Sequence, residues 1–163
     1  MKSFYGNRRS VRLIGYDYSQ KGMYFLTICA KERQTWFGKI IGGIMEINDL
    51  GKKVLSIWNE LPQRFAVKTD VSQIMPNHFH GIIEICFEEQ GTRSTLSKCI
   101  GYFKFRVSRD TGMKIWQRNY YERIIRNEAE LWRIRAYIKN NPKNWERDRE
   151  NEGAHQDAPK GDS

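Results

Sequence analysis

Two of the three histidines in this 163-residue chain, His78 and His80, are separated by one residue within an apolar, β-branched segment. Residues i and i+2 of a strand point to the same face, so the two imidazoles would lie side by side with Phe79 turned into the core. Two convergent imidazoles on a rigid strand make half of a site for a divalent metal ion. The competing interpretation is a pair of polar residues on a solvated sheet face, and the spacing alone favours neither.

Tyr137 and Asn141 lie four residues apart at the end of the last expected helix, so they share a face of that helix. Tyrosine is a possible nucleophile, and the asparagine amide offers a neutral oxygen ligand. If this helix packs across the sheet at the histidine strand, Asn141 completes a three-ligand site with open positions, one helical turn from Tyr137. The alternatives are a core aromatic and a helix C-cap.

A metal ion in such a site would polarise a phosphoryl group and orient it for in-line attack by the tyrosine. The resulting phosphotyrosine conserves the energy of the broken phosphodiester, so rejoining needs no nucleotide cofactor. Tyr120 and Tyr121 compete with Tyr137 as candidate nucleophiles.

The formal net charge of +9 is unevenly distributed along the chain. Residues 143–163 hold four Lys or Arg against six Asp or Glu, so residues 1–142 carry a net +11. A small domain with that excess attracts polyanions, nucleic acid first, although a generic basic protein is the simpler alternative. The composition excludes a membrane protein, because no apolar run approaches the roughly 20 residues of a bilayer span. The odd number of cysteines and the absence of a signal peptide favour reduced thiols and a cytoplasmic location.

The elements that must position these residues follow from periodicity and from turn residues. The pattern predicts an α+β fold, a ferredoxin-like sandwich with an antiparallel sheet of four to five strands and helices packed on one side. One domain would span residues 1–144, with a basic arm at 1–21, and 145–163 would be a polar, disordered tail. Strands are expected at 23–30, 36–41, 44–47, 67–75, 78–87 and within 114–126, and helices at 48–62, 95–108 and 127–140, the last stopped by Pro142.

Five segments make the chain resemble a known family: 15–19, 24–29, 75–81 (Met-Pro-Asn-His-Phe-His-Gly), 116–122 and 136–142 (Ala-Tyr-Ile-Lys-Asn-Asn-Pro). They are similar to the motifs of the REP-associated tyrosine transposases, within the wider group of small HUH transposases that act on single-stranded DNA. The pairing of the histidine motif with the tyrosine motif some 60 residues later is the specific signal. The resemblance covers most of the domain, from about residue 15 to residue 142.

The resemblance implies that His78 and His80 bind Mg²⁺ or Mn²⁺, with Asn141 in the third ligand position. It implies that Tyr137 cuts one DNA strand, stays attached to the 5′ phosphate and leaves a free 3′ hydroxyl. The substrate would be a DNA hairpin with flanking single strand. Some relatives are monomers and others are homodimers with shared active sites, and both states are compatible with this chain.

Charge alone suggests further DNA contacts. The arm with Arg8, Arg9 and Arg12 is a plausible reader of unpaired bases. Lys98, Lys104 and Arg106 are plausible contacts to the hairpin backbone, and Arg118 lies in an aromatic, basic segment suited to single strands. Solvated helix faces and buried aromatics explain the same patterns equally well. Two rival functions remain: a non-catalytic module that binds hairpin DNA or RNA, and a metal-dependent phosphodiesterase that uses water.

Overall fold

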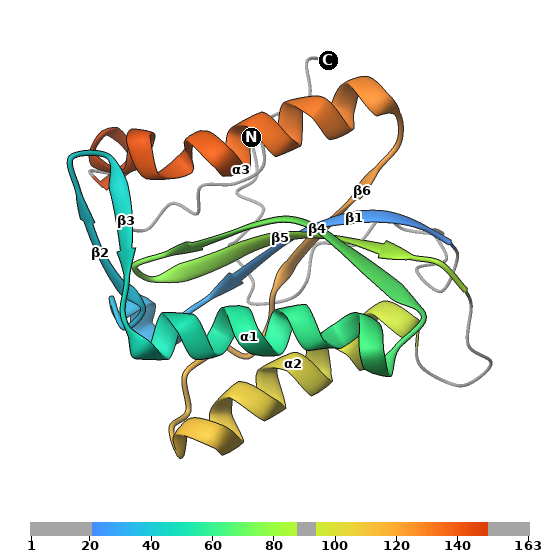
Figure 1. The fold of residues 1–163 in the computed structure, drawn as a ribbon, viewed down its shortest axis with the longest axis horizontal. Helices are drawn as coiled ribbons and strands as arrows, with labels where there is room; N and C mark the ends of the chain where they lie inside the picture. Colours follow the sequence, from blue (N-terminus) through green and yellow to red (C-terminus); the bar gives the residue numbers. More distant parts are fainter. Residues whose placement is uncertain (1–20, 88–93, 150–163) are drawn as a thin grey trace.

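The computed structural model describes residues 21–87 and 94–149 of the chain. Its sheet elements and helices alternate in the order expected for an α+β fold (Figure 1). In chain order they are β1 (Gly22–Cys29), the short 3-10 turn η1 (Lys31–Arg33), β2 (Gly38–Ile41), β3 (Ile44–Ile47), α1 (Asp49–Arg64), β4 (Val67–Met75), β5 (His78–Ile85), α2 (Thr95–Thr111), β6 (Tyr121–Ile125) and α3 (Glu128–Arg149).

The main sheet has four antiparallel strands in the order β4-β5-β1-β6, with β1 paired to both β5 and β6. Without the β2–β3 hairpin, the chain runs β1-α1-β4-β5-α2-β6, which is the split βαβ order of a ferredoxin-like fold. The predicted fold class is therefore confirmed. Helices α1 and α2 cover one face of the sheet, as expected, whereas the expected last helix, α3, crosses the opposite face, so the helices are not all on one side (Figure 1).

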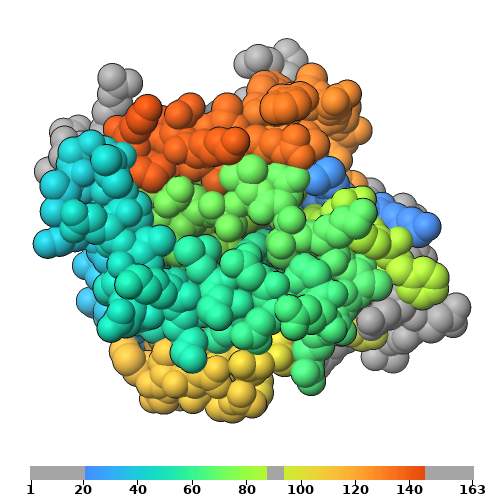
Figure 2. Space-filling model, viewed as in Figure 1, coloured from blue at the N-terminus to red at the C-terminus, as the bar shows by residue number. Residues whose placement is uncertain are grey.

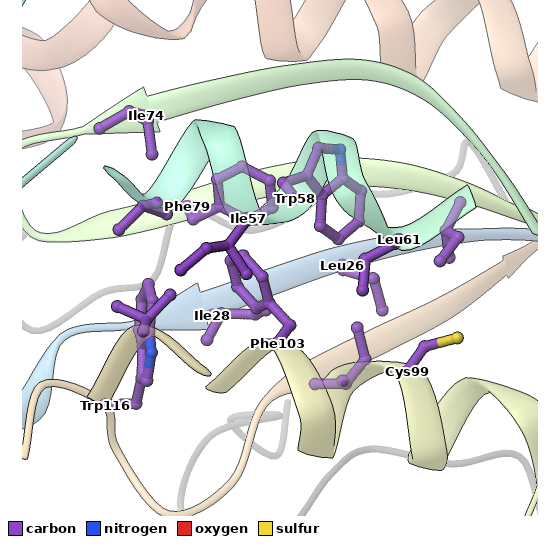
Figure 3. Close-up of a cluster of buried hydrophobic side chains, with 14 of the residues drawn as sticks. Leu26, Ile28, Ile57, Trp58, Leu61, Ile74, Phe79, Cys99, Phe103 and Trp116 are labelled. Atoms are coloured by element: carbon purple, nitrogen blue, oxygen red, sulfur yellow. The ribbon is translucent and has the colours of Figure 1, made fainter. Parts of the chain in front are cut away.

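Strand alternation divides the buried side chains between the two faces of the sheet. Phe79 of β5 points to the α1–α2 side, where its ring centroid lies 4.8 Å from that of Trp58 and 5.5 Å from that of Phe103 (Figure 3). This side holds the larger core. On the other side a smaller cluster joins the sheet to α3 through four fully buried residues: Phe25, Ile82, Ile134 and Ile138.

The predicted helix starts are confirmed by side-chain caps. Asn48 Oδ1 accepts the Gly51 N–H at 2.9 Å at the start of α1, and Asn127 Oδ1 accepts the Glu130 N–H at 2.8 Å at the start of α3. Gly112 ends α2 in the left-handed conformation, with a φ of 68°. The sequence thus sets where these helices begin and where α2 ends.

The prediction that α1 ends at Pro62 and α3 at Pro142 is wrong. Helix α1 runs two residues past Pro62, and α3 continues through Pro142 to Arg149, so residues 145–149 of the expected tail are helical. A proline removes one backbone hydrogen bond, and tertiary packing can offset that loss. Here Asn141 and Pro142 are buried. The β2–β3 turn packs against the same part of α3 (Figure 2). The contact is close, because a Cβ added to Gly43 would be 3.5 Å from Lys143 Cα.

In the part of the chain that the structure describes, every helix is too short or too polar to cross a bilayer.

Candidate metal and nucleophile site

The histidine motif lies at the turn between β4 and β5. Met75 pairs with His78, so Pro76 and Asn77 form the two-residue connection. His78 and His80 point to the face that α3 covers, and they are buried, with 7% and 0% of their surface exposed. The interpretation as polar residues on a solvated face is therefore wrong. Two buried imidazoles need polar partners, because an unsatisfied buried ring nitrogen is costly.

The two imidazoles face each other through their Nε2 atoms, which are 3.1 Å apart. The Nδ1 atom of each ring has a polar side-chain partner. Asn77 Oδ1 lies 2.7 Å from His78 Nδ1, and Thr27 Oγ1 lies 2.9 Å from His80 Nδ1. An amide oxygen can only accept, so His78 Nδ1–H donates and its Nε2 keeps a lone pair directed towards His80. If His80 has the same tautomer, the Nε2 lone pairs of the two imidazoles point towards one position between the rings.

Burial keeps both rings neutral at physiological pH. Burial lowers the pKa of His78 to about 3, with the charge of Arg33 acting in the same direction and a hydrogen bond to the Asn141 side chain opposing it. Burial also lowers the pKa of His80 well below its usual value, assisted by the neighbouring His78 and opposed by a backbone hydrogen bond at Leu26. Neutral imidazole is the form that binds a metal ion.

The arrangement passes a simple geometric test for a divalent ion. Two ligands at right angles, each about 2.1 Å from one ion, are about 3 Å apart, which matches the Nε2 separation. Among the side chains that the structure describes, no group of three His, Cys, Asp or Glu residues could hold a metal. Asn141, which is 2% exposed and hydrogen-bonded to His78, adds an amide group beside the two imidazoles.

Tyr137 lies over the same site from α3. Its ring centroid is 5.6 Å from that of His80 and 6.2 Å from that of Phe25, and Phe25 stacks on His80 at 5.3 Å. Tyr137 belongs to the partly buried residues around the smaller core. The structure thus brings together residues from β5 and α3 that are some 60 positions apart in the sequence.

The competing tyrosines occupy different positions. Tyr120 packs against the core on the α1–α2 side of the sheet. Tyr121, at the start of β6, lies on the α3 side with its ring centroid 6.2 Å from that of Phe25. Tyr137 is the candidate whose ring is placed directly beside an imidazole.

The predicted DNA-contacting cations are not gathered at this site. Lys98, Lys104 and Arg106 lie on α2, across the sheet from the histidines, while Arg8, Arg9 and Arg12 fall outside the described residues. Lys104 Nζ donates to the carbonyl oxygens of Gln117 and Arg118 at 2.6 and 3.0 Å, and burial lowers its pKa to about 8. Arg106 pairs with Glu60 at 3.5 Å and with Asp110 at 3.3 Å. A role for these residues in DNA binding stays a prediction.

Sequence reasoning missed several side chains that shape the site. Thr27 gave no signal of its own, although it pairs directly with His80 in the β1–β5 register. Asn77 stood inside the histidine motif without an assigned role. Trp145 was placed in the tail, yet its ring centroid lies 6.3 Å from that of His78. Continuing the helical spacing from Tyr137 and Asn141 by four more residues would have found it.

Comparison with known proteins identifies proteins of similar sequence and similar fold. No family model matches the chain. A Haemophilus influenzae protein named only as uncharacterised is 40% identical over 165 residues, covering 87% of this chain and 92% of its own. A second protein of that species, proposed to be a REP-associated tyrosine transposase, is 24% identical over 139 residues, covering 77% and 73%.

Two solved structures share the fold. A REP-associated tyrosine transposase bound to a REP hairpin superposes with a TM-score of 0.63 at 18% identity, covering 93% of both chains. A proposed transposase of Deinococcus radiodurans gives a TM-score of 0.50 at 16% identity, covering 80% of this chain and 96% of its own.

The chain therefore has the fold of two transposase structures and is similar in sequence to a protein proposed to be a REP-associated tyrosine transposase. The chain belongs to the same family as the 40% identical Haemophilus protein, and its predicted relationship to the REP-associated tyrosine transposases is confirmed.

Proposed function

We propose that this protein is a metal-dependent endonuclease and strand transferase that cuts single-stranded DNA next to a hairpin through a 5′-phosphotyrosine intermediate. The observation that carries the proposal is the convergence of Tyr137 and Asn141 from α3 on the facing Nε2 atoms of His78 and His80. A rival binding module would have no use for a buried, neutral imidazole pair beside a tyrosine. Hairpin DNA is the proposed substrate because the structural relative was solved with a REP hairpin.

A divalent ion, Mg²⁺ or Mn²⁺, held by His78, His80 and Asn141, would supply Lewis-acid polarisation of the phosphoryl oxygens. Tyr137 Oη attacks the phosphorus and forms the new O–P bond, and its proton passes to solvent. The P–O3′ bond breaks, and the departing oxygen takes up a proton to become the free 3′ hydroxyl. Attack of a 3′ hydroxyl on the phosphotyrosine reverses these steps and rejoins a strand.

The decisive test is the covalent adduct. The full chain is incubated with Mn²⁺ and a 3′-labelled hairpin that carries single-stranded flanks, so that the label stays on the strand that becomes linked to the protein, and the products are separated under denaturing conditions. We expect a protein-linked strand with the wild type and none with Tyr137→Phe, because the variant lacks the attacking oxygen. Tyr120→Phe is the matched control and should form the adduct normally.

The outcomes separate the rival functions. An adduct with Tyr137→Phe would place the nucleophile elsewhere, with Tyr121 the next candidate. Cleavage by Tyr137→Phe to free 5′ phosphate ends would favour a phosphodiesterase that uses water. If a chelator does not change hairpin binding and no cleavage occurs under any condition, the protein is a non-catalytic binding module.

Metal dependence is tested separately at the histidines. We expect His78→Ala and His80→Ala each to abolish cleavage and to weaken Mn²⁺ binding at least tenfold in calorimetry, since each variant removes one of three donors. Hairpin binding measured with a chelator present should be retained. Unchanged Mn²⁺ affinity in both variants would remove the metal site from the proposal.

A further inference from the structure

The tip of the β2–β3 hairpin carries a pair of apolar side chains that face solvent. Ile41 and Ile44 are direct cross-strand partners next to the turn, and 51% and 68% of their surface is exposed. Met45 and Ile47, on the opposite face of the hairpin, pack against the larger core. Single exposed apolar residues are common, but a paired apolar projection is the kind of group that proteins insert between DNA base steps.

The hairpin is fixed at its base and shaped by a tight turn at its tip. At the base, the Phe37 N–H donates to the Pro76 carbonyl at 3.1 Å, and the buried Phe37 ring has its centroid 5.2 Å from that of Trp116. In the turn, Gly42 and Gly43 have φ values of 58° and 75°, and positive φ at both central residues suits the twist of the flanking strands. The hairpin can therefore hold its two isoleucines in one position.

The tip lies beside the part of α3 that completes the candidate site (Figure 1, Figure 2). Its turn contacts α3 at Lys143, two residues after Asn141. Lys139 and Lys143 are four residues apart and both exposed, so they share one side of this helix. An apolar projection next to exposed lysines suits DNA, because the lysines attract phosphates while the apolar side chains contact the base stack.

We propose that Ile41 and Ile44 form a wedge that inserts into the first base step of the DNA hairpin stem, next to the single-stranded flank, and unstacks the terminal base pair. The inference rests on the proposed function, whose substrate must enter the site as an unpaired strand. Unstacking a base step is costly, and apolar insertion offsets part of that cost. The wedge therefore makes the nucleotides nearest the stem available to Tyr137.

The first test measures base stacking directly. The fluorescent base 2-aminopurine, which brightens when it is unstacked, replaces an adenine in the terminal base pair of a flanked DNA hairpin. The full chain is added to saturation with a chelator present, so that no cleavage occurs. We expect the wild type to raise the fluorescence several-fold. The double variant Ile41→Thr/Ile44→Thr should leave it close to the value of free DNA, whereas Ile41→Val/Ile44→Val should retain the rise.

The two double variants form a matched pair, since threonine and valine have similar shapes and both suit strands, so they differ mainly in polarity. Phe105→Ser is the control for the loss of an exposed apolar side chain. Phe105 is 59% exposed on α2, across the sheet from the candidate site, and its variant should give wild-type fluorescence. If the double threonine variant does not fold, Ile44→Thr decides, because it changes only the more exposed member of the pair.

The second test uses the rate at which the Tyr137 adduct forms. On a fully paired stem, we expect the double threonine variant to be about tenfold slower than the wild type, because its tip no longer offsets part of the unstacking cost. On a stem whose terminal two base pairs are mismatched, the variant should match the wild type, since little stacking remains to be broken. Equal slowing on both stems would contradict the wedge.

The wedge is also overturned if bound wild-type protein does not raise the fluorescence, or if the folded double threonine variant raises it equally. If that variant instead converts a dimer into a monomer in analytical ultracentrifugation, with fluorescence unchanged, the isoleucines are an interface between two copies of this chain. The proposed strand transfer survives each of these results, because the Tyr137 adduct on the mismatched stem is a separate readout. Conversely, a fluorescence rise that requires the isoleucines, with no adduct in the wild type, would retain the wedge and remove the transferase.

Discussion

Each imidazole has a polar side chain within hydrogen-bond distance of its Nδ1 atom. His78 is held by the amide of Asn77, the residue before it in the turn, and His80 by the hydroxyl of Thr27, its cross-strand partner on β1. Such partners fix the tautomer and the ring plane of a metal-binding histidine, and their loss commonly costs 10- to 100-fold in metal affinity. Both residues are therefore positioning residues for the proposed metal site.

Thr27→Val tests this role with little change in shape. The valine removes the hydroxyl and leaves His80 Nδ1 buried without its side-chain partner, so we expect Mn²⁺ affinity to fall about tenfold in calorimetry. Stability should fall by about 1–3 kcal/mol in denaturant unfolding, the usual cost of an unsatisfied buried polar group. Thr27→Ser keeps the hydroxyl and should restore the metal affinity. Equal Mn²⁺ binding by the valine and serine variants would contradict the role.

At the scale of elements, α3 is the part that completes the site, and an ion pair fastens it to β4. Arg135 of α3 donates to both oxygens of Asp70, from Nε at 2.9 Å and from one terminal nitrogen at 2.6 Å. The two side chains keep 25% and 23% of their surface exposed. The Arg135 hydrogen bond is the main reason that the pKa of Asp70 lies below its usual value, with burial opposing it and the Val71 N–H and Lys139 assisting.

This pair predicts a pH-dependent contribution to stability. Because the folded pKa of Asp70 is depressed, its contribution is fully present above the unfolded pKa near 3.8 and is lost as the pH falls through the folded value. We expect Asp70→Asn to lower the free energy of unfolding by about 1–3 kcal/mol at pH 7, as for a hydrogen bond to a charged group. The difference between variant and wild type should be constant above pH 5 and should shrink towards pH 2. A pH-independent difference in denaturant unfolding would show that the charge is not involved.

The sequence predicts correctly the elements whose signals come from residues that are close together in the chain. The alternating histidine strand, the capping residues Asn48 and Asn127 and the order of strands and helices all follow from nearest neighbours in the chain. The end of α3 does not, because burial of Asn141 and Pro142 against distant elements outweighs the proline signal. The role of Lys104 could not be predicted from local sequence either, because its ammonium donates to carbonyl oxygens 13 and 14 residues away.

At the scale of the whole molecule, the sheet separates the larger core from the candidate site. The larger core lies between the sheet and α1–α2, whereas the smaller cluster under α3 holds the helix that carries Tyr137 and Asn141. Both cores contribute to the free energy of folding, but only the smaller one sets the distance between α3 and the histidines. Stability and metal affinity should therefore respond independently to substitutions on the two sides.

Ile100 of α2 and Ile138 of α3 form a matched pair for this test, since both are fully buried isoleucines on helices that face opposite sides of the sheet. Replacing either with alanine should cost about 2–5 kcal/mol in denaturant unfolding, through lost burial and the cavity left behind. Ile138→Ala should also raise the Mn²⁺ dissociation constant several-fold, because α3 can then shift against β5 and carry Asn141 away from His78. Ile100→Ala should leave that constant unchanged, as should the milder Ile100→Val. If the two alanine variants bound Mn²⁺ equally well, the position of α3 would not govern the metal site, and the helix would serve the nucleophile alone.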